Sequence, residues 1–337
     1  MLSFVKIVLS WLYSLGVSIR HVLYDKYLLP SFSVKVPTIC VGNIAVGGTG
    51  KTPMTAYLVQ LLLDKGYHPA VLSRGYKRKT HGFLLADTLS TTETIGDEAM
   101  QLHRAFPDVP IAVCEHRVRG VHQLQRQVEQ LDVVVLDDAM QHRRLRCGLT
   151  ILLTAYDHLY IDDHMLPWGT LRDLPSRALK ADAVVVTKCP DNMRPIDMRV
   201  IDNRLRLPTY QLLHFAGITY APITQAGTPL VLTGIARPQY MLEHVREQYP
   251  NAELIAYPDH HAFTPKDIDD IMVRAKHFDF VLTTEKDLQR LTRTDLEARL
   301  SAEGKHLIAL PIRMRWFTPQ PTFDKQILQY VHENCRK

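Results

Sequence analysis

The sequence predicts an α/β fold: a parallel sheet of the P-loop NTPase type with helices on both faces, and a smaller C-terminal α/β domain. The first observation is the stretch 36–55, where an apolar run, a glycine-rich turn and an amphipathic pattern follow one another. The second is the alternation of strand-like apolar runs with helical patterns over the rest of the 337 residues. Such alternation is typical of parallel sheets covered on both faces.

Residues 1–29 are predicted to form an amphipathic helix. Apolar side chains recur there at helical spacing, with basic residues between them. The apolar run 7–17 is too short to span a bilayer, and no small-residue cleavage site of a signal peptide follows it. The residues alone leave two interpretations open, which are a helix lying in a membrane interface and a helix packed on the protein core.

The predicted core domain, residues 30–215, begins with a phosphate-binding loop. Glycines let the backbone approach a polyphosphate and direct its N–H groups at it, and the next helix N-terminus adds positive potential. Lys51 is expected to contact the β- and γ-phosphates, and Thr52 to bind Mg²⁺. Ala45 departs from the usual pattern, which has glycine there. The residues expected to bind the nucleotide are Gly47, Gly48, Thr49, Gly50, Lys51 and Thr52.

A strand predicted at 69–73 ends in a basic cluster of Arg74, Lys77 and Arg78. Ligands of open α/β sheets bind at the carboxyl ends of strands, so the cluster is a candidate site for an anionic group. The alternative is a solvated basic turn. Farther along, Asp97 stands where a helix begins, so it either caps the helix or supplies a catalytic base.

The apolar strand predicted at 132–138 ends in Asp137 and Asp138. P-loop enzymes use an acid at the end of such a strand to organise Mg²⁺, so these two residues join Thr52 as candidate metal ligands. The alternative is an acid that caps a turn. Strands predicted at 149–153 and 183–187 complete this domain.

The smaller domain, residues 216–337, is predicted from a second series of strands and helices. Strands are expected at 230–234, 253–257, 280–284 and 306–310, and a closing helix at 326–332. His260 and His261 fall in a polar loop between them. Two adjacent histidines are by themselves a weak metal-binding pattern.

Composition restricts the function classes. A net charge of +5 and a pI of about 8.9 suit an anionic ligand or a membrane surface. The 5 cysteines are scattered without CxxC spacing, which indicates a reducing compartment and neither a zinc site nor a disulfide framework. We expect neither a nucleic acid partner nor an obligate protein partner.

Three classes of nucleotide protein compete. A regulatory GTPase needs a Thr/Asn-Lys-x-Asp motif, but the nearest candidate, 187–191, is one residue too long. A partitioning ATPase has a first lysine where this chain has Val46. A small-molecule or lipid kinase needs an ATP site, a base and a second domain, all of which the chain offers. The alternative is a P-loop ATPase switch or scaffold protein at the membrane.

Seven motifs in this order resemble the tetraacyldisaccharide 4′-kinases of lipid A biosynthesis. They are VGNIAVGGTGKTP (41–53), LSRGYKR (72–78), GDEAM (96–100), LDDAMQHR (136–143), LPWGTLRD (166–173), YPDHHAF (257–263) and TTEKD (283–287). The resemblance implies an ATP- and Mg²⁺-dependent enzyme, peripheral on the cytoplasmic face of the bacterial inner membrane. It implies phosphorylation of the 4′-hydroxyl of an acylated glucosamine disaccharide 1-phosphate, which gives lipid IVA. It also favours the membrane interpretation of residues 1–29.

The resemblance further implies roles for individual residues. Asp97 matches the catalytic aspartate, and His260 matches its partner histidine, which we expect the second domain to bring in on closure. Asp137 and Asp138 match the acidic pair that serves Mg²⁺ and ATP. The residues expected to contact the substrate are Arg74, Lys77, Arg78, His142 and Arg172. Two positions depart from the family pattern, with Ala99 where proline is common and Asp173 where glutamate is common.

Overall fold

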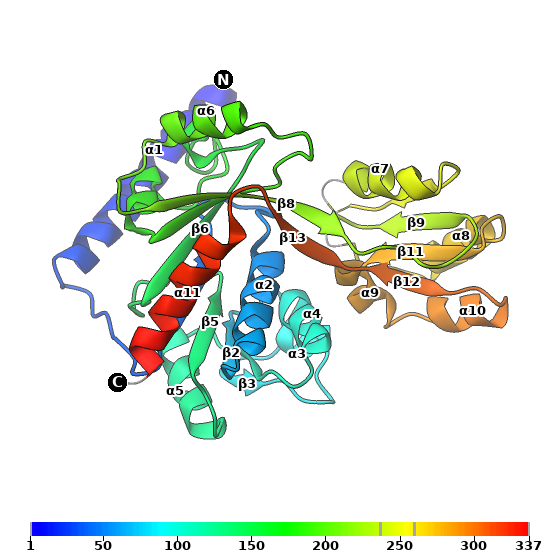
Figure 1. Cartoon of the computed structure of the whole chain (residues 1–337), viewed down its shortest axis with the longest axis horizontal. Coiled ribbons are helices and arrows are strands. Elements are labelled where there is room, and N and C mark those ends of the chain that lie inside the picture. Colours follow the sequence, from blue (N-terminus) through cyan, green and yellow to red (C-terminus); the bar gives the residue numbers. More distant parts are fainter. Residues whose placement is uncertain (1, 236–237, 259–260, 336–337) are drawn as a thin grey trace.

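The computed structural model describes residues 2–235, 238–258 and 261–335, and contains two sheets joined by a ribbon of two strands (Figure 1). The predicted class is confirmed: a mainly parallel sheet covered by helices on both faces, and a smaller α/β unit. His260, the predicted partner of Asp97, lies outside the described residues.

The larger sheet is parallel except at its two edge strands, β13 and β3, which pair antiparallel with their neighbours. Its nine described strands lie in the order β13 (Ile312–Trp316), β8 (Leu212–Tyr220), β7 (Ala183–Thr187), β6 (Leu149–Ala155), β1 (Thr38–Gly42), β5 (Val133–Asp137), β2 (Pro69–Ser73), β4 (Ile111–Val113) and β3 (Leu84–Leu85).

The central strand β1 sets the position of the candidate site. All five of its residues are buried, as its apolar sequence requires for a strand covered on both faces. It pairs with β5 so that Val41 lies opposite Asp137. The loop that leaves β1 therefore starts beside the acidic end of β5.

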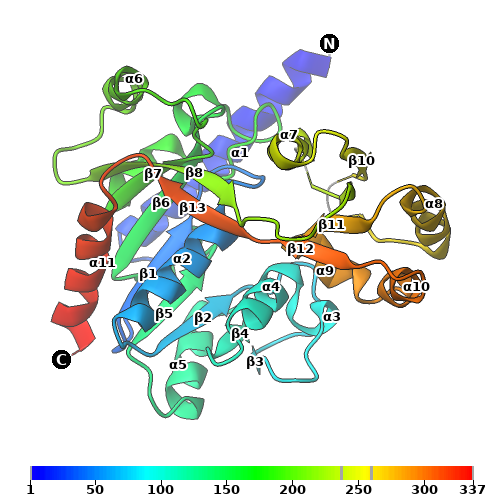
Figure 2. The same cartoon turned by 45° about the vertical axis from the view of Figure 1, so that its right-hand side comes forward.

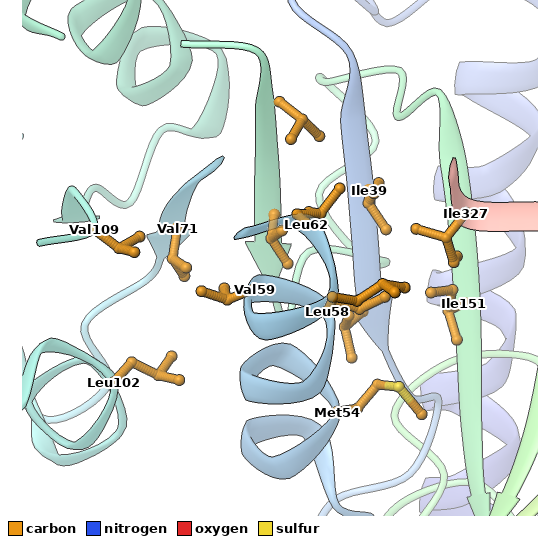
Figure 3. Packing of buried hydrophobic residues seen from close by; sticks show 14 of the residues in the cluster. Ile39, Met54, Leu58, Val59, Leu62, Val71, Leu102, Val109, Ile151 and Ile327 are labelled. Atoms are coloured by element: carbon orange, nitrogen blue, oxygen red, sulfur yellow. The ribbon is translucent and has the colours of Figure 1, made fainter. Parts of the chain in front are cut away.

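One face of this sheet is covered by α2 (Lys51–Asp64), α3 (Thr92–Ile95), α4 (Asp97–Ala105) and α11 (Gln320–Cys335). The apolar side chains of α2 recur every four residues, so Met54, Leu58 and Leu62 face the strands together. Figure 3 shows them next to Ile39 and Ile151, and all five side chains are fully buried. This cluster is the main core of the molecule.

The opposite face is covered by α5 (Arg117–Gln127), α6 (Pro195–Leu205), the short helices η1 (Tyr160–Asp162) and η2 (Pro175–Lys180), and α1 (Leu2–Asp25). Val121 and Leu124 of α5 pack on Cys40 and Leu136 of the strands. Ile201 of α6 packs in a neighbouring cluster. Both faces of the strands are thus closed, as their continuous apolar sequence indicates.

The smaller sheet is parallel and lies in the order β10 (Glu253–Ala256), β9 (Pro229–Thr233), β11 (Phe280–Thr284) and β12 (Leu307–Leu310). One face carries α7 (Pro238–Gln248), and the other carries α8 (Pro265–Ala275), α9 (Glu285–Leu291) and α10 (Leu296–Ala302) (Figure 2). Helix α9 packs against α4 of the larger unit.

The predicted boundary of the smaller domain was wrong at both ends. Residue 216 lies inside β8, and β13 returns to pair with it. Phe323, Ile327 and Val331 of α11 are fully buried in the core of the larger sheet. The sequence predicted a closing helix at 326–332, but its position in the chain alone did not tell which sheet it covers. The smaller unit is therefore an insertion between β8 and β13.

Helix α1 is longer than the apolar run that predicted it. By length and composition Phe4–Asp25 could cross a membrane, a weak criterion that signal sequences also meet, and 17 % of its most apolar window is buried. Trp11 is 78 % exposed and Leu12 is 61 % exposed. Ser10 and Tyr13 donate hydrogen bonds to the backbone oxygens of Met165 and Arg172. The helix thus has one side attached to the protein and an apolar side that is open.

His214 on β8 provides a stability prediction. It is 3 % exposed, its ring packs edge-on against Phe323 at 5.1 Å, and neither ring nitrogen has a partner among the described residues. Burial lowers its pKa to about 4. The unfolded chain, with an ordinary histidine pKa of about 6.5, therefore binds more protons, so stability is lost as the pH falls from about 6.5 toward 4.

When the pH falls from 7 to 5, the unfolding free energy of His214→Phe should decrease by about 1–2 kcal/mol less than that of the wild type. Urea unfolding at both pH values measures it. The exposed His122 offers the control His122→Gln, which should keep the wild-type pH dependence. An unchanged pH dependence in His214→Phe would contradict the assignment.

Candidate active site

The loop between β1 and α2 has the geometry of a phosphate-binding loop. Gly47 and Gly50 have φ of 106° and 85°, which side chains rarely tolerate. A Cβ added at Gly47 or Gly48 would meet no atom within 4 Å, so this backbone is open to a ligand. Ala45 has no positive φ and forms a bridge with Leu171, which explains why alanine fits at the position of the pattern's first glycine.

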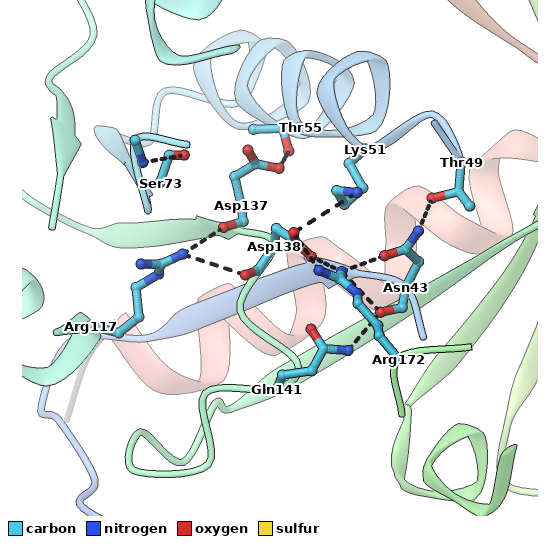
Figure 4. A network of polar contacts seen from close by, with 11 residues as sticks. Asn43, Thr49, Lys51, Thr55, Ser73, Arg117, Asp137, Asp138, Gln141 and Arg172 are labelled. Atoms are coloured by element: carbon cyan, nitrogen blue, oxygen red, sulfur yellow. Dashed lines mark hydrogen bonds and ion pairs between the residues drawn. The ribbon is translucent and has the colours of Figure 1, made fainter. Parts of the chain in front are cut away.

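Asn43, at the start of the loop, holds it in place (Figure 4). It is fully buried, and its Nδ2 donates to Thr49 Oγ1 at 2.8 Å while its Oδ1 accepts from Arg172 Nη2 at 2.5 Å. Thr187 Oγ1 donates to the backbone oxygen of Thr49 at 2.8 Å. Sequence analysis missed Asn43 and Thr187. The available signal was only their place at the ends of two strands.

The two acids at the end of β5 have different surroundings. Asp137 is fully buried; one carboxylate oxygen accepts from Thr55 Oγ1 at 3.5 Å, and the other has no partner among the described residues. Burial, with the nearby carboxylates of Glu98 and Asp138, raises its pKa to about 7. A buried carboxylate oxygen without a partner fits a ligand of Mg²⁺.

Asp138 is instead engaged by cations. It pairs with Arg172, whose Nη1 lies 3.0 Å from Oδ2, and with Lys51, whose Nζ lies 4.0 Å from the same oxygen. Burial alone would raise its pKa, but Arg172 and Lys51 outweigh burial and lower it. No group of three or more His, Cys, Asp or Glu able to hold a metal occurs in the described part of the chain.

Arg117, which sequence analysis also missed, supports the acidic end of β5. It is 1 % exposed, and its guanidinium donates to the backbone oxygens of Cys114 at 2.6 Å, Asp137 at 3.3 Å and Asp138 at 3.4 Å. Burial lowers its pKa. In the sequence Arg117 is one of several basic residues of a helix, and nothing distinguishes it from the others.

Asp97 lies at the first turn of α4, after Gly96. Gly96 has a φ of 87°, and a Cβ there would lie 2.9 Å from the backbone oxygen of Tyr76, so the loops approach too closely for any side chain. The Oδ2 of Asp97 accepts from Nε and Nη2 of Arg290 on α9, at 3.1 and 2.9 Å. Arg290 also contacts the fully buried Asp287 at 3.0 Å. The smaller unit therefore reaches the predicted base through a residue that sequence analysis missed.

The three residues of the basic cluster after β2 differ in exposure: two face solvent and one is buried. Lys77 lines a narrow pocket together with Asp97 and Tyr76, and Arg74 is exposed nearby. Arg78 points inward: its side chain is 2 % exposed, and Nη2 donates to Glu115 at 2.6 Å and to the backbone oxygen of Gly82 at 2.5 Å. Arg78 therefore supports this loop, and the arrangement does not favour its predicted contact with the substrate.

Four further residues named in the sequence analysis have partners within the protein. His142 Nε2 contacts the backbone oxygen of Glu115 at 2.8 Å, and burial lowers its pKa. Arg172 is held by Asp138 and Asn43. Asp173, where the family pattern has glutamate, lies 2.5 Å from His21 of α1. His261 Nε2 lies 3.0 Å from Oδ2 of Asp267, in the first turn of α8.

Comparisons with known proteins agree on one family. The family model for tetraacyldisaccharide-1-P 4′-kinases matches residues 2–332. The chain is similar to the tetraacyldisaccharide 4′-kinases of Flavobacterium johnsoniae (43 % identity, 96 % of this chain, 95 % of the relative) and Bacteroides thetaiotaomicron (42 %, 97 % and 93 %). Among solved structures it is similar to LpxK from Aquifex aeolicus in complex with ATP, with a TM-score of 0.76, 26 % identity and coverage of 98 % and 100 %.

The hydrogen bonds of Asn43 generate a prediction. Asn43→Ala removes the donor to Thr49 and the acceptor for Arg172, so the phosphate loop loses its fixed shape. We expect the Kd for ATP to rise about tenfold, which corresponds to about 1.4 kcal/mol. Isothermal titration calorimetry measures it. The control is Gln60→Ala, an exposed side chain on α2 that contacts Asp64, and equal affinity in the two variants would contradict the prediction.

Proposed function

Because this chain belongs to the tetraacyldisaccharide 4′-kinase family, we propose that it transfers the γ-phosphoryl group of ATP to the 4′-hydroxyl of a tetraacylated glucosamine disaccharide 1-phosphate, which gives lipid IVA. The observation that carries the proposal is that the phosphate loop and the acidic end of β5 lie side by side at the carboxyl ends of two central strands of the larger sheet. Helix α4, which begins at Asp97, packs against α2, the helix that follows the phosphate loop. A nucleotide site and a base thus meet there, which a switch or scaffold protein does not require.

The phosphates of ATP are assigned to the open backbone of residues 47–51 and to the ammonium group of Lys51. Mg²⁺ is assigned to Thr52 and to the unpartnered oxygen of Asp137. When bound, Mg²⁺ neutralises charge on the phosphate oxygens during transfer. Asp138 is assigned a positioning role, because its ion pairs hold Lys51 and Arg172 next to the phosphate loop.

Asp97 is assigned as the base that accepts the proton of the attacking hydroxyl. Arg290 fixes one of its carboxylate oxygens through two N–H groups, so the carboxylate has a defined orientation. General base catalysis of this kind contributes about 10²–10⁴ in rate. The partnership of His260 with Asp97 remains a prediction from the sequence. Lys77 and Arg74 are the cations best exposed to bind the polar head of the substrate.

The lipid substrate and helix α1 together support a peripheral position on the cytoplasmic face of the inner membrane. Polar contacts at Ser10, Tyr13, Arg20 and His21 attach the helix to the larger unit along much of its length. A helix that crossed the bilayer would lose them. With these contacts kept, the exposed apolar side, which includes Trp11, can enter the interface while the helix lies flat.

The first experiment measures ATP-dependent phosphate transfer to tetraacyldisaccharide 1-phosphate in detergent micelles. We expect Asp97→Asn to lower kcat by at least about 10²-fold while the Kd for ATP stays within about twofold. Asp64→Asn, at the exposed end of α2, is the matched control. Failure of the wild type to transfer phosphate while it binds ATP would contradict the acceptor. Equal rates in wild type and Asp97→Asn would contradict the base.

A second experiment tests the membrane position. Replacing Trp11, Leu12 and Leu15 by glutamine removes exposed apolar surface and leaves the polar contacts of α1 intact. We expect binding to phospholipid vesicles, measured by flotation, to fall about 100-fold. The control replaces Leu89, Tyr210 and Val273, which are equally exposed elsewhere. Vesicle binding that persists in the α1 variant would refute the assignment.

A further inference from the structure

A second cavity, of about 420 Å³, lies at the C-terminal end of α1. The last turn of α1, the loop after β5, and η2 form its walls, with Cys40 of β1 and Thr150 of β6 also lining it. It shares no lining residue with the pocket beside Asp97. None of the steps proposed above uses it.

The charge of this cavity is strongly positive. Arg143, Arg146, Arg177 and Lys180 line it, and the carboxylate of Asp25 faces them. Asp25 forms an ion pair with Arg143, whose Nη2 lies 2.5 Å from Oδ1 of Asp25. Within the described residues, no carboxylate pairs with Arg146, Arg177 or Lys180, so the walls carry an excess of three positive charges.

Arg177 is the most informative of these cations. Its side chain is half-buried and has no hydrogen bond or ion pair to any described residue. Burial and the adjacent cation Arg143 lower its pKa and outweigh the opposing effect of the carboxylates of Asp173 and Asp25, so its charged form is disfavoured there. Keeping an unpaired guanidinium partly buried beside a second one costs stability. A bound anion would offset that cost.

The arginines identify the chemistry of the anion. Guanidinium groups bind phosphate oxygens through two parallel N–H donors, and two arginines flanking one cavity suit a tetrahedral phosphate group. The volume lies within the range of small-molecule sites of about 300–1,000 Å³, so it accommodates a phosphate together with a glycerol-sized group.

The surroundings of the cavity identify the source of the phosphate. Tyr27, which lines the cavity directly after α1, is 76 % exposed, and the next residue, Leu28, is 68 % exposed. Leu179, the neighbour in sequence of the lining residue Lys180, is 43 % exposed. Arg146 lies 5.5 Å over the ring of Tyr27. Apolar and tyrosine side chains around a basic pocket are typical of sites at the membrane interface.

We propose that this cavity binds the phosphate of an anionic glycerophospholipid, whose acyl chains lie on Tyr27, Leu28 and the exposed side of α1. The proposal rests on the membrane position proposed for α1. It gives the C-terminal end of that helix a specific anchor, in addition to the apolar surface along its length. On this proposal, binding at the cavity depends on an anionic lipid headgroup that fits it, and the overall net charge of the protein does not determine it.

The test uses the full chain with Arg146→Gln/Arg177→Gln. The matched control is Arg119→Gln/Arg126→Gln, which removes the same charge from exposed positions on α5. Flotation compares vesicles of phosphatidylcholine with vesicles that also contain phosphatidylglycerol, at 150 mM salt. Each basic residue near such a surface contributes about 1 kcal/mol. The factor by which phosphatidylglycerol strengthens vesicle binding should therefore be about 30-fold smaller in the cavity variant than in the wild type. The control should keep most of that gain, and an equal loss in both variants would overturn the proposal.

Soluble ligands separate the lipid from free phosphate and do not depend on membrane binding. Monomeric dihexanoyl phosphatidylglycerol should bind the wild type at least tenfold more tightly than inorganic phosphate, and the cavity variant should bind neither. Equal affinity for the two ligands, or binding of neither to the wild type, would overturn the proposal. The cavity variant should keep its kinase rate in detergent micelles, and its Tm should stay equal or rise, because Arg177 loses no partner and Arg146 loses only its contact with the exposed ring of Tyr27. A lowered Tm would indicate a structural role for these arginines and would likewise overturn the proposal.

Discussion

The parallel pairing of β1 with β5 is the contact on which the rest of the site depends. It aligns Val41 with Asp137 and so sets the glycine loop and the acidic strand end side by side. Three side chains then hold what the pairing brings together. Asn43 fixes the loop, Arg117 fixes the backbone of the two acids, and Arg172 joins Asn43 to Asp138. These side chains hydrogen-bond to one another and to the backbone of the loop and strand, so the site has a defined shape before a ligand binds.

The segment 170–173 connects this network with α1. Arg172 reaches the phosphate loop through its side chain, and its backbone oxygen accepts a hydrogen bond from Tyr13. The next residue, Asp173, pairs with His21. A movement of α1 against the sheet must therefore be accommodated by the residues that hold the loop. Helix α1 and the phosphate loop are in this sense one mechanical unit.

The features that the sequence predicted correctly are local ones. A strand, a glycine turn and a helix that follow one another need no tertiary information, and the acids at the end of β5 follow directly from an apolar run. The features that were missed depend on distant pairings. Arg290 meets Asp97 across 193 positions of sequence, and Arg117 is one of several arginines until the fold buries it. Arg78 was misjudged for the same reason, since only the fold reveals that it turns inward to Glu115.

The return of α11 to the larger sheet affects the order in which the protein can be completed on the ribosome. The strands of that sheet up to β8 and the whole inserted unit are synthesised before residue 312. Until α11 emerges, the core around Ile39 and Leu58 lacks the cover supplied by Ile327, and the backbone of Thr38 lacks the hydroxyl of Tyr330, which lies 3.1 Å from its nitrogen. The nascent chain therefore carries an uncovered apolar surface during most of its synthesis, when it is open to aggregation and to chaperones. A premature stop that removes this helix would leave the same surface exposed permanently.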